Sequence, residues 1–203
     1  LGKNRRMKRA RASGDTEFEN SSLIEHANCV PAHVERFAHS LVIDRWLGEG
    51  LEWDCVLLDG QLDEPDLPFS RLSELEGFDG FRRWIHYWAA EYASCADAVA
   101  LKLSLIHARR PTCPRFHVDR IQLRLIATLY GPGTEWLHPH DVKYVVDGGI
   151  NQDIDCALIN RMHKGSVGLF PGACAELVPI GGVVHRSPLS DEDRVILKID
   201  KIA

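Results

Sequence analysis

The sequence predicts an α+β protein in which a helical layer packs on a double-stranded β-helix, that is, a jelly-roll or cupin-like barrel. Apolar residues recur at helical spacing in the first half of the chain, whereas from residue 99 onward they recur at every second position. The second half is also divided into short extended runs by glycine turns, a pattern typical of antiparallel barrels. At 203 residues we expect one domain over 21–203, with the helical layer at about 31–97 and the barrel at about 98–203.

Residues 1–20 are predicted to form a disordered basic tail, because lysines and arginines alternate there with few apolar side chains. The net charge of −5 argues against a nucleic-acid partner. No apolar run approaches the roughly 20 residues that cross a bilayer, and the tail lacks the apolar segment of a signal peptide. The six cysteines form no Cys-x-x-Cys pair. We therefore expect a cytoplasmic protein with reduced thiols and no membrane partner.

Two helices are expected in the first half. Pro31 at a first-turn position opens the first, Pro31–Ile43, which has one apolar face. The second, Phe78–Asp97, is predicted to lie against the outside of a sheet. Its apolar stripe consists of Phe81, Trp84, Ile85, Trp88, Tyr92 and Cys95. Between the helices, Val56–Leu58 predicts a short strand, and the prolines and glycine of residues 59–68 predict a loop.

The second half predicts a series of strands, with a polar insertion at residues 141–155. The expected extended segments are 99–108, 120–130, 134–137, 162–171 (strand, turn, strand), 181–188 and 194–200. In segment 120–130 the odd-numbered residues are apolar and most even-numbered ones are polar. Since His117 and Asp119 are odd-numbered, we expect them on the face that continues into the buried interior, with Thr128 and Tyr130 facing away.

His117 and Asp119 are the first candidates for a functional site. Residues two apart on a strand point to the same side, so an imidazole and a carboxylate project together. A third ligand has to come from a distant strand, and His185 at the end of segment 181–188 is the candidate. Two imidazoles and one carboxylate are the ligand set of non-haem iron oxygenases. The alternative is that His117 and Asp119 form a hydrogen-bonded pair at the surface.

The order of these residues carries a family resemblance. His-x-Asp, a gap of some tens of residues, His185, and then Arg194 nine residues later resembles the iron(II)- and 2-oxoglutarate-dependent oxygenases. The strings Cys-Pro-Arg-Phe-His-Val-Asp-Arg (113–120), Gly-Pro-Gly-Thr-Glu-Trp (131–136) and Val-His-Arg-Ser-Pro (184–188) are similar to a bacterial family, domain of unknown function 1826. Members of that family have no settled activity, and some are encoded beside zinc-homeostasis genes.

The oxygenase resemblance implies that His117, Asp119 and His185 hold Fe(II), and that the substrate is a small molecule or a protein. It also implies that the keto acid of 2-oxoglutarate binds the metal, while the guanidinium of Arg194 meets its distal carboxylate. A hydroxyl group of Ser187, Thr128 or Tyr130 is a candidate to assist. Alternatively, Arg194 forms a surface salt bridge with Asp191 or Asp193. Other cations on predicted strands are Arg186, which points away from His185 by parity, Arg124 and Lys198.

The sequence is also compatible with two other functions. One is a non-catalytic, cupin-like metal-binding protein linked to zinc homeostasis, in which Zn(II) replaces iron and Cys113 is a further possible ligand. The other is a zinc hydrolase, because three protein ligands plus water also suit catalytic zinc. Arg194 discriminates among them, since an oxygenase requires an interior cation near the metal and a zinc store does not.

Overall fold

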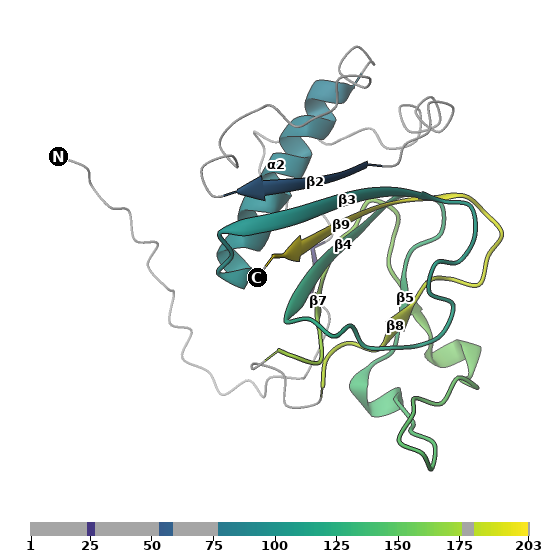
Figure 1. The fold of residues 1–203 in the computed structure, drawn as a ribbon. Coiled ribbons are helices and arrows are strands. Elements are labelled where there is room, and N and C mark those ends of the chain that lie inside the picture. Colours follow the sequence, from purple (N-terminus) through teal and green to yellow (C-terminus); the bar gives the residue numbers. More distant parts are fainter. Residues whose placement is uncertain (1–23, 27–52, 59–76, 176–180, 203) are drawn as a thin grey trace, which may run out of the picture.

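The computed structural model describes residues 24–26, 53–58, 77–175 and 181–202. Within these residues the protein is mostly β-sheet, with two antiparallel sheets and one long helix on the outer side of the larger sheet (Figure 1). The two sheets do not close into a barrel within the described part of the chain. The predicted tail at 1–20, helix at 31–43 and loop at 59–68 lie outside the described residues, so the helical layer is represented by the one long helix.

The larger sheet collects strands from the whole length of the chain. In spatial order it contains β1 (Ile24–His26), β7 (Val167–Pro171), β4 (Leu123–Tyr130), β9 (Arg194–Lys201), β3 (Ala100–Ala108) and β2 (Trp53–Leu58). The smaller sheet contains β6 (Asn160–Arg161), β5 (Glu135–Trp136) and β8 (His185–Arg186). Two short 3-10 helices, η1 (Pro139–Asp141) and η2 (Cys156–Leu158), flank the predicted insertion. The strands predicted at 99–108 and 194–200 are therefore confirmed as β3 and β9.

The long helix α2 (Phe78–Ala96) confirms the helix predicted from the aromatic stripe. Its stripe is buried against the sheet from Phe78 to Tyr92, and Tyr92 extends the contact with hydrogen bonds. The Tyr92 hydroxyl donates to the carbonyl oxygen of Leu123 at 2.7 Å and accepts from the amide of Lys201 at 2.9 Å. Cys95 was wrongly included in the stripe, since it is exposed in the last turn of α2. No helix among the described residues has the length and apolarity needed to cross a bilayer.

The two faces of the larger sheet have different neighbours. Odd-numbered residues pack against α2 in one cluster, which includes Leu101, Leu103, Leu105, Leu125, Ala127, Leu129, Val195, Leu197 and Ile199. Even-numbered Ile126 and Ile196 belong to a second cluster with Met162, Phe170 and Val183. The inner face of the larger sheet is thus the even-numbered face of β3 and β9 and, as far as Thr128, of β4; the register shifts after Thr128, and Tyr130 packs on the α2 side.

The expectation that the odd-numbered face continues from His117 and Asp119 into β4 is wrong. Strand β4 begins only at Leu123, and residues 120–122 interrupt the extended backbone. Their carbonyl groups, instead of pairing in a ladder, accept hydrogen bonds from the segment after β7: Gln122 O from Gly172 N at 3.0 Å and Ile121 O from Cys174 N at 3.0 Å. Period-two alternation cannot be carried across such a break.

Gly172 allows this close contact between segments far apart in the sequence. A Cβ atom at residue 172 would lie 2.3 Å from the carbonyl oxygen of Ile121 and 2.6 Å from that of Asp119. The next amide, Ala173 N, donates to the same Asp119 oxygen at 2.8 Å. Because only glycine lacks the obstructing atom, it permits the backbone of Asp119 to be held against the turn after β7.

Candidate metal centre

The three residues predicted as metal ligands converge in the structure. One side-chain ligand atom each from His117, Asp119 and His185 lie within 4.8 Å of one another. The His117 Nε2 atom is 3.6 Å from Asp119 Oδ1, and the His185 Nε2 atom is 3.5 Å from Asp119 Oδ2. His117 and His185 are also backbone partners, each amide donating to the other's carbonyl at 3.0 Å. A β-bridge therefore joins the two halves of the site.

Both imidazoles are oriented by backbone carbonyl groups two residues earlier in the chain. The His117 Nδ1 atom lies 2.8 Å from Arg115 O, and the His185 Nδ1 atom lies 3.0 Å from Val183 O. A carbonyl oxygen can only accept, so the proton of each neutral ring belongs on Nδ1. Each Nε2 lone pair is then directed toward Asp119, which is the arrangement that ligating histidines require.

Asp119 is kept ionised by its surroundings. Burial alone would raise the pKa of this carboxyl group, but the nearby imidazoles of His117 and His185 and the charge of Arg124 hold that pKa far below its usual range. Arg124 Nη1 donates to Asp119 Oδ2 at 2.8 Å. The interaction with Asp119 in turn raises the pKa of His117, against the opposing effect of burial. The site therefore holds a half-buried negative charge that can bind a cation.

Arg194 lies inside the protein beside these three residues. It is 2% exposed and lines one cavity together with His117, Asp119 and His185. Its Nε atom donates to Pro132 O at 2.7 Å and its Nη2 atom donates to Thr134 Oγ1 at 3.2 Å, so both recorded partners are uncharged oxygens. Burial lowers the pKa of Arg194 to about 10, which leaves the guanidinium charged at neutral pH.

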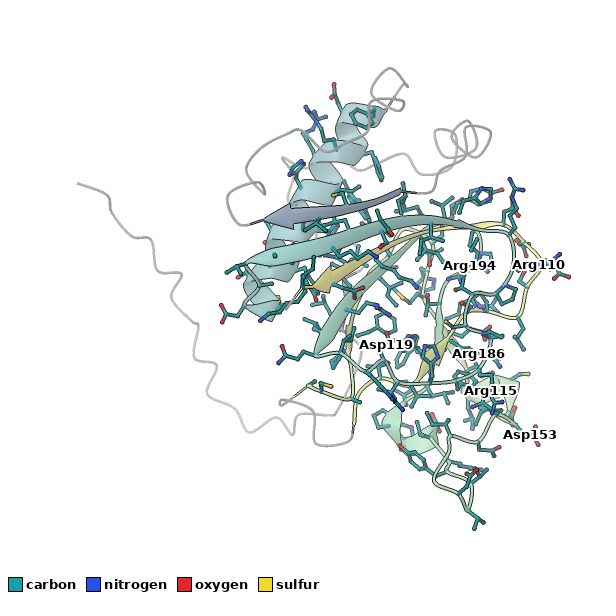
Figure 2. All side chains as sticks on the ribbon, in the orientation of Figure 1. Arg110, Arg115, Asp119, Asp153, Arg186 and Arg194 are labelled. Carbon is teal, nitrogen blue, oxygen red and sulfur yellow. The ribbon has the colours of Figure 1, made fainter. Side chains whose placement is uncertain are left out.

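The alternative partners considered for Arg194 do not apply. Asp193 pairs with His107 Nε2 at 2.9 Å, and Arg194 is buried and hydrogen-bonded elsewhere, so the surface salt bridge is wrong. Arg186 donates to Glu135 Oε2 at 2.7 Å and lies over the ring of Phe116. Figure 2 shows Arg194 on the inner side of the larger sheet, with Arg186 on β8. Arg194 is thus the arginine of this pair without a carboxylate partner among the described residues.

The hydroxyl groups near Arg194 are arranged differently from the prediction. Thr128 shares the inner face of β4 with Ile126, contrary to the expectation that it faces away. Its Oγ1 atom is buried and has no hydrogen-bond partner among the described residues. Ser187 is engaged by Thr112 Oγ1 at 3.0 Å and by the amide of Cys113 at 3.2 Å. The sequence did not predict a role for Thr134, whose hydroxyl accepts a hydrogen bond from Arg194, because Thr134 follows a glycine turn and belongs to no periodic pattern.

The cavity at the metal centre is narrow, at about 50 Å³. Lys198 and Arg124 also form part of its wall, and neither was assigned a role from the sequence. Cys113 lines the cavity but is exposed and is not a member of the three-residue ligand group. The cavity therefore contains one candidate cation site and four basic side chains, those of Arg124, Arg186, Arg194 and Lys198.

Comparison with known proteins identifies a family. The family described as "Protein of unknown function (DUF1826)" matches residues 26–200. No curated protein matches the chain.

Similar solved structures include a Pseudomonas putida prolyl-4-hydroxylase, with 13% identity, 90% of this chain and 94% of that chain covered, and a TM-score of 0.44. The dioxygenase for auxin oxidation in rice has 13% identity, coverage of 86% and 65%, and a TM-score of 0.41. The viral collagen prolyl hydroxylase of Paramecium Bursaria Chlorella virus-1, in complex with 2OG, has 10% identity, coverage of 91% and 98%, and a TM-score of 0.34. At these scores the likenesses add no argument to the one made from the site itself.

Proposed function

This chain belongs to the DUF1826 family, and we propose that it is an iron(II)- and 2-oxoglutarate-dependent oxygenase. His117, Asp119 and His185 would hold the metal, and Arg194 would bind the distal carboxylate of 2-oxoglutarate. We further propose that the two sheets belong to a double-stranded β-helix, as the sequence predicts. The function is an oxidation carried out in the space between the sheets.

The observation that carries this proposal is the burial of Arg194 in the same cavity as the three ligand candidates. A buried guanidinium without a carboxylate partner is costly, and an anionic ligand offsets that cost. The hydrogen-bond partners of Arg194 among the described residues are neutral, Pro132 O and Thr134 Oγ1. The nearby carboxylate of Glu135 is already paired with Arg161 and Arg186. A metal store or a zinc hydrolase has no use for such a cation, whereas a dicarboxylate cosubstrate does.

The donor set fits iron(II). Two neutral imidazoles and one carboxylate on one side of the ion leave positions open for further ligands. The Nδ1 atoms of His117 and His185 are already held by carbonyl groups, so little reorganisation precedes metal binding. The buried hydroxyl of Thr128 lacks a partner among the described residues and lies on the same sheet face as the cavity wall, which supports a polar ligand in this space.

With iron, 2-oxoglutarate and dioxygen bound, the site would oxidise a substrate C–H bond while 2-oxoglutarate is converted to succinate and carbon dioxide. The residues of the chain would bind and orient. Asp119 contributes the negative charge that the metal requires, and Arg194 fixes the cosubstrate through two hydrogen bonds. Because the cavity is only about 50 Å³, side chains around it have to move when a five-carbon acid binds.

The test compares wild-type protein with Arg194→Met and Arg194→Lys, each loaded with iron(II). We expect the wild type to bind 2-oxoglutarate in a titration under nitrogen and to release succinate in air. Arg194→Met should weaken 2-oxoglutarate binding by about tenfold or more, because a charged hydrogen-bonded pair is lost, and Arg194→Lys should retain part of it. Metal content should be equal in all three proteins.

Succinate release that is unchanged in Arg194→Met removes the assigned role of Arg194. Tight zinc binding that depends on His117, Asp119 and His185, without any 2-oxoglutarate binding, supports the zinc-handling alternative instead.

A further inference from the structure

A second, larger cavity adjoins the metal centre on the inner face of the larger sheet. Its volume is about 540 Å³, and Asp54, Lys102, Ser104, Ile106 and Asp200 form much of its wall. Arg124 and Lys198 line both this cavity and the one at the metal centre. The two cavities therefore share these two side chains.

The register of the strands arranges the charged groups in rows. Lys102 of β3 and Arg124 of β4 both pair with Asp200 of β9, which places the three residues side by side. In the next row, Lys198 lies between Ser104 of β3 and Ile126 of β4. Since residues 198 and 200 of a strand share one face, all these side chains project toward the cavities.

Most of the charges in this wall are paired. Lys102 Nζ lies 3.2 Å from Asp54 Oδ2, and Arg124 binds both oxygens of Asp200, at 2.6 and 2.9 Å. Among the described residues, Lys198 has neither a hydrogen-bond partner nor an ion-pair partner for its ammonium group. Burial, followed by the positive charge of Arg124, lowers the pKa of Lys198. An anion next to Lys198 would relieve this unfavourable position.

We propose that the larger cavity is the substrate site of the proposed oxygenase, and that it takes a small molecule whose carboxylate group binds Lys198. This inference rests on the proposed function only in calling the ligand a substrate. The carboxylate-binding site itself does not depend on that function. Of the three cations in the cavity wall, Lys102 is paired with Asp54 and Arg124 with both Asp200 and Asp119, so the ammonium group of Lys198 is the positive charge that has no ion-pair partner in the described part of the chain. A carboxylate balances that charge, whereas a phosphate monoester with a charge of about −1.5 to −2 exceeds it.

The position of Lys198 separates this role from that of Arg194. The two residues are four positions apart on the same face of β9, a separation of roughly 13 Å along a strand. Ile196 lies between them and lines the metal-centre cavity. One cation is therefore available for the cosubstrate deep in the fold, and the other for a second acid at the junction of the cavities.

The experiment uses the 203-residue chain loaded with Zn(II), a metal that does not support oxygenase turnover. Three matched probes are compared: phenylacetate, phenylacetamide and phenyl phosphate. Binding is followed by ¹⁵N-resolved NMR titration in wild type, Lys198→Met, Lys102→Met and Arg194→Met. We expect phenylacetate to bind more tightly than either of the other probes. Its affinity should fall about tenfold in Lys198→Met, the loss of one charge-assisted hydrogen bond, and less than threefold in the other two variants.

Lys102→Met is the matched control, because it removes the same charge from the same cavity wall but a lysine already paired with Asp54. Equal losses in Lys198→Met and Lys102→Met, equal binding of phenylacetamide, tighter binding of phenyl phosphate, or no binding of any probe would each overturn the proposal. Repeating the titration without metal must preserve the dependence on Lys198; otherwise phenylacetate binds through the metal and the proposal fails. If instead Lys198-dependent binding is found while 2-oxoglutarate turnover is absent, only the oxygenase function is lost.

Discussion

Arg124 donates from Nη1 to Oδ2 of Asp119 at 2.8 Å, and this contact orients the only carboxylate of the candidate metal group. Asp200 binds the other side of the same guanidinium through Nε and Nη2. The planar group is thus held between two carboxylates, one from the site and one from β9. Because the geometry of a guanidinium is rigid, the Asp119 carboxylate is restricted in rotation before any metal arrives.

Arg124→Met is therefore predicted to weaken metal binding although Arg124 is not itself a ligand. Loss of a residue that orients a ligand typically costs about 10- to 100-fold in metal affinity. Competition with a chromophoric chelator measures that affinity for zinc and for iron(II). Lys102→Met serves as the control, since Lys102 pairs with Asp54 and lies outside the metal-centre cavity. Equal affinities of Arg124→Met and wild type would show that Asp119 needs no such support.

Gly172→Ala is predicted to disturb the site from a distance. The new Cβ would meet two backbone oxygens, Ile121 O at 2.3 Å and Asp119 O at 2.6 Å, and backbone atoms cannot move aside as the end of a side chain can. We expect a loss of about 1–3 kcal/mol in the free energy of unfolding, as for other overpacked positions, together with weaker metal binding. In Gly149→Ala the Cβ meets the flexible side chain of Asp147, so chemical denaturation should show little change. A stable Gly172→Ala protein with normal metal affinity would contradict the proposed close packing.

The elements that could be predicted from sequence are those long enough to repeat a pattern. Helix α2 repeats its apolar stripe over 19 residues, and strands β3 and β9 alternate over nine and eight residues. The smaller sheet consists of two-residue strands, too short for any alternation to be seen. Strands β5 and β8 lie within the predicted segments 134–137 and 181–188, whose partners were not predicted, and β6 was not predicted at all.

Within the site, the His-x-Asp spacing and His185 were sufficient to predict three side chains that do converge. The alternation of odd and even positions does not extend from β4 to His117 and Asp119, because residues 121 and 122 bond to residues 174 and 172, about 50 positions later in the chain. Such long-range backbone contacts leave no local signal in the sequence. The roles suggested here for Thr134 and Lys198 likewise depend on which strands are neighbours, which a single sequence does not specify.

The metal-free protein is predicted to depend on Asp119 more strongly at pH 5.5 than at pH 8.5. The hydrogen bond with Asp119 is the main cause that raises the pKa of His117. The stability that the charged His117 ring contributes is therefore complete below the ordinary histidine pKa of about 6.5, and it is lost as the pH rises through the raised pKa. The lowered pKa of Asp119 provides stability above the ordinary aspartate value of about 3.9, which is lost as the pH falls. Both conditions hold together between about pH 4 and 6.5.

Urea denaturation of chelator-treated wild type and Asp119→Asn at the two pH values measures this dependence. The difference in the free energy of unfolding should be larger at pH 5.5. In a His117→Gln background, the contribution of His117 to the pH dependence of this free-energy difference should disappear. A difference that is larger at pH 8.5 in the otherwise native chain would mean that His117 is not stabilised in its charged form.

Tyr92→Phe is predicted to destabilise the fold without altering the metal centre. The Tyr92 hydroxyl donates to Leu123 O and accepts from Lys201 N, and burial raises its pKa to about 12. Removal of the oxygen leaves two backbone groups without partners between α2 and the sheet, at a cost of about 1–3 kcal/mol.

Tyr130→Phe is the matched control, because the Tyr130 hydroxyl has no hydrogen bond among the described residues and the Tyr130 ring packs under Lys164. The expected cost of this control substitution is below about 0.5 kcal/mol. Urea denaturation should separate the two variants while chelator competition gives both the wild-type metal affinity, since α2 packs on the face of the sheet opposite to His117, Asp119 and His185. Equal losses of stability, or a lower metal affinity in Tyr92→Phe, would mean that the two faces of the larger sheet are not independent.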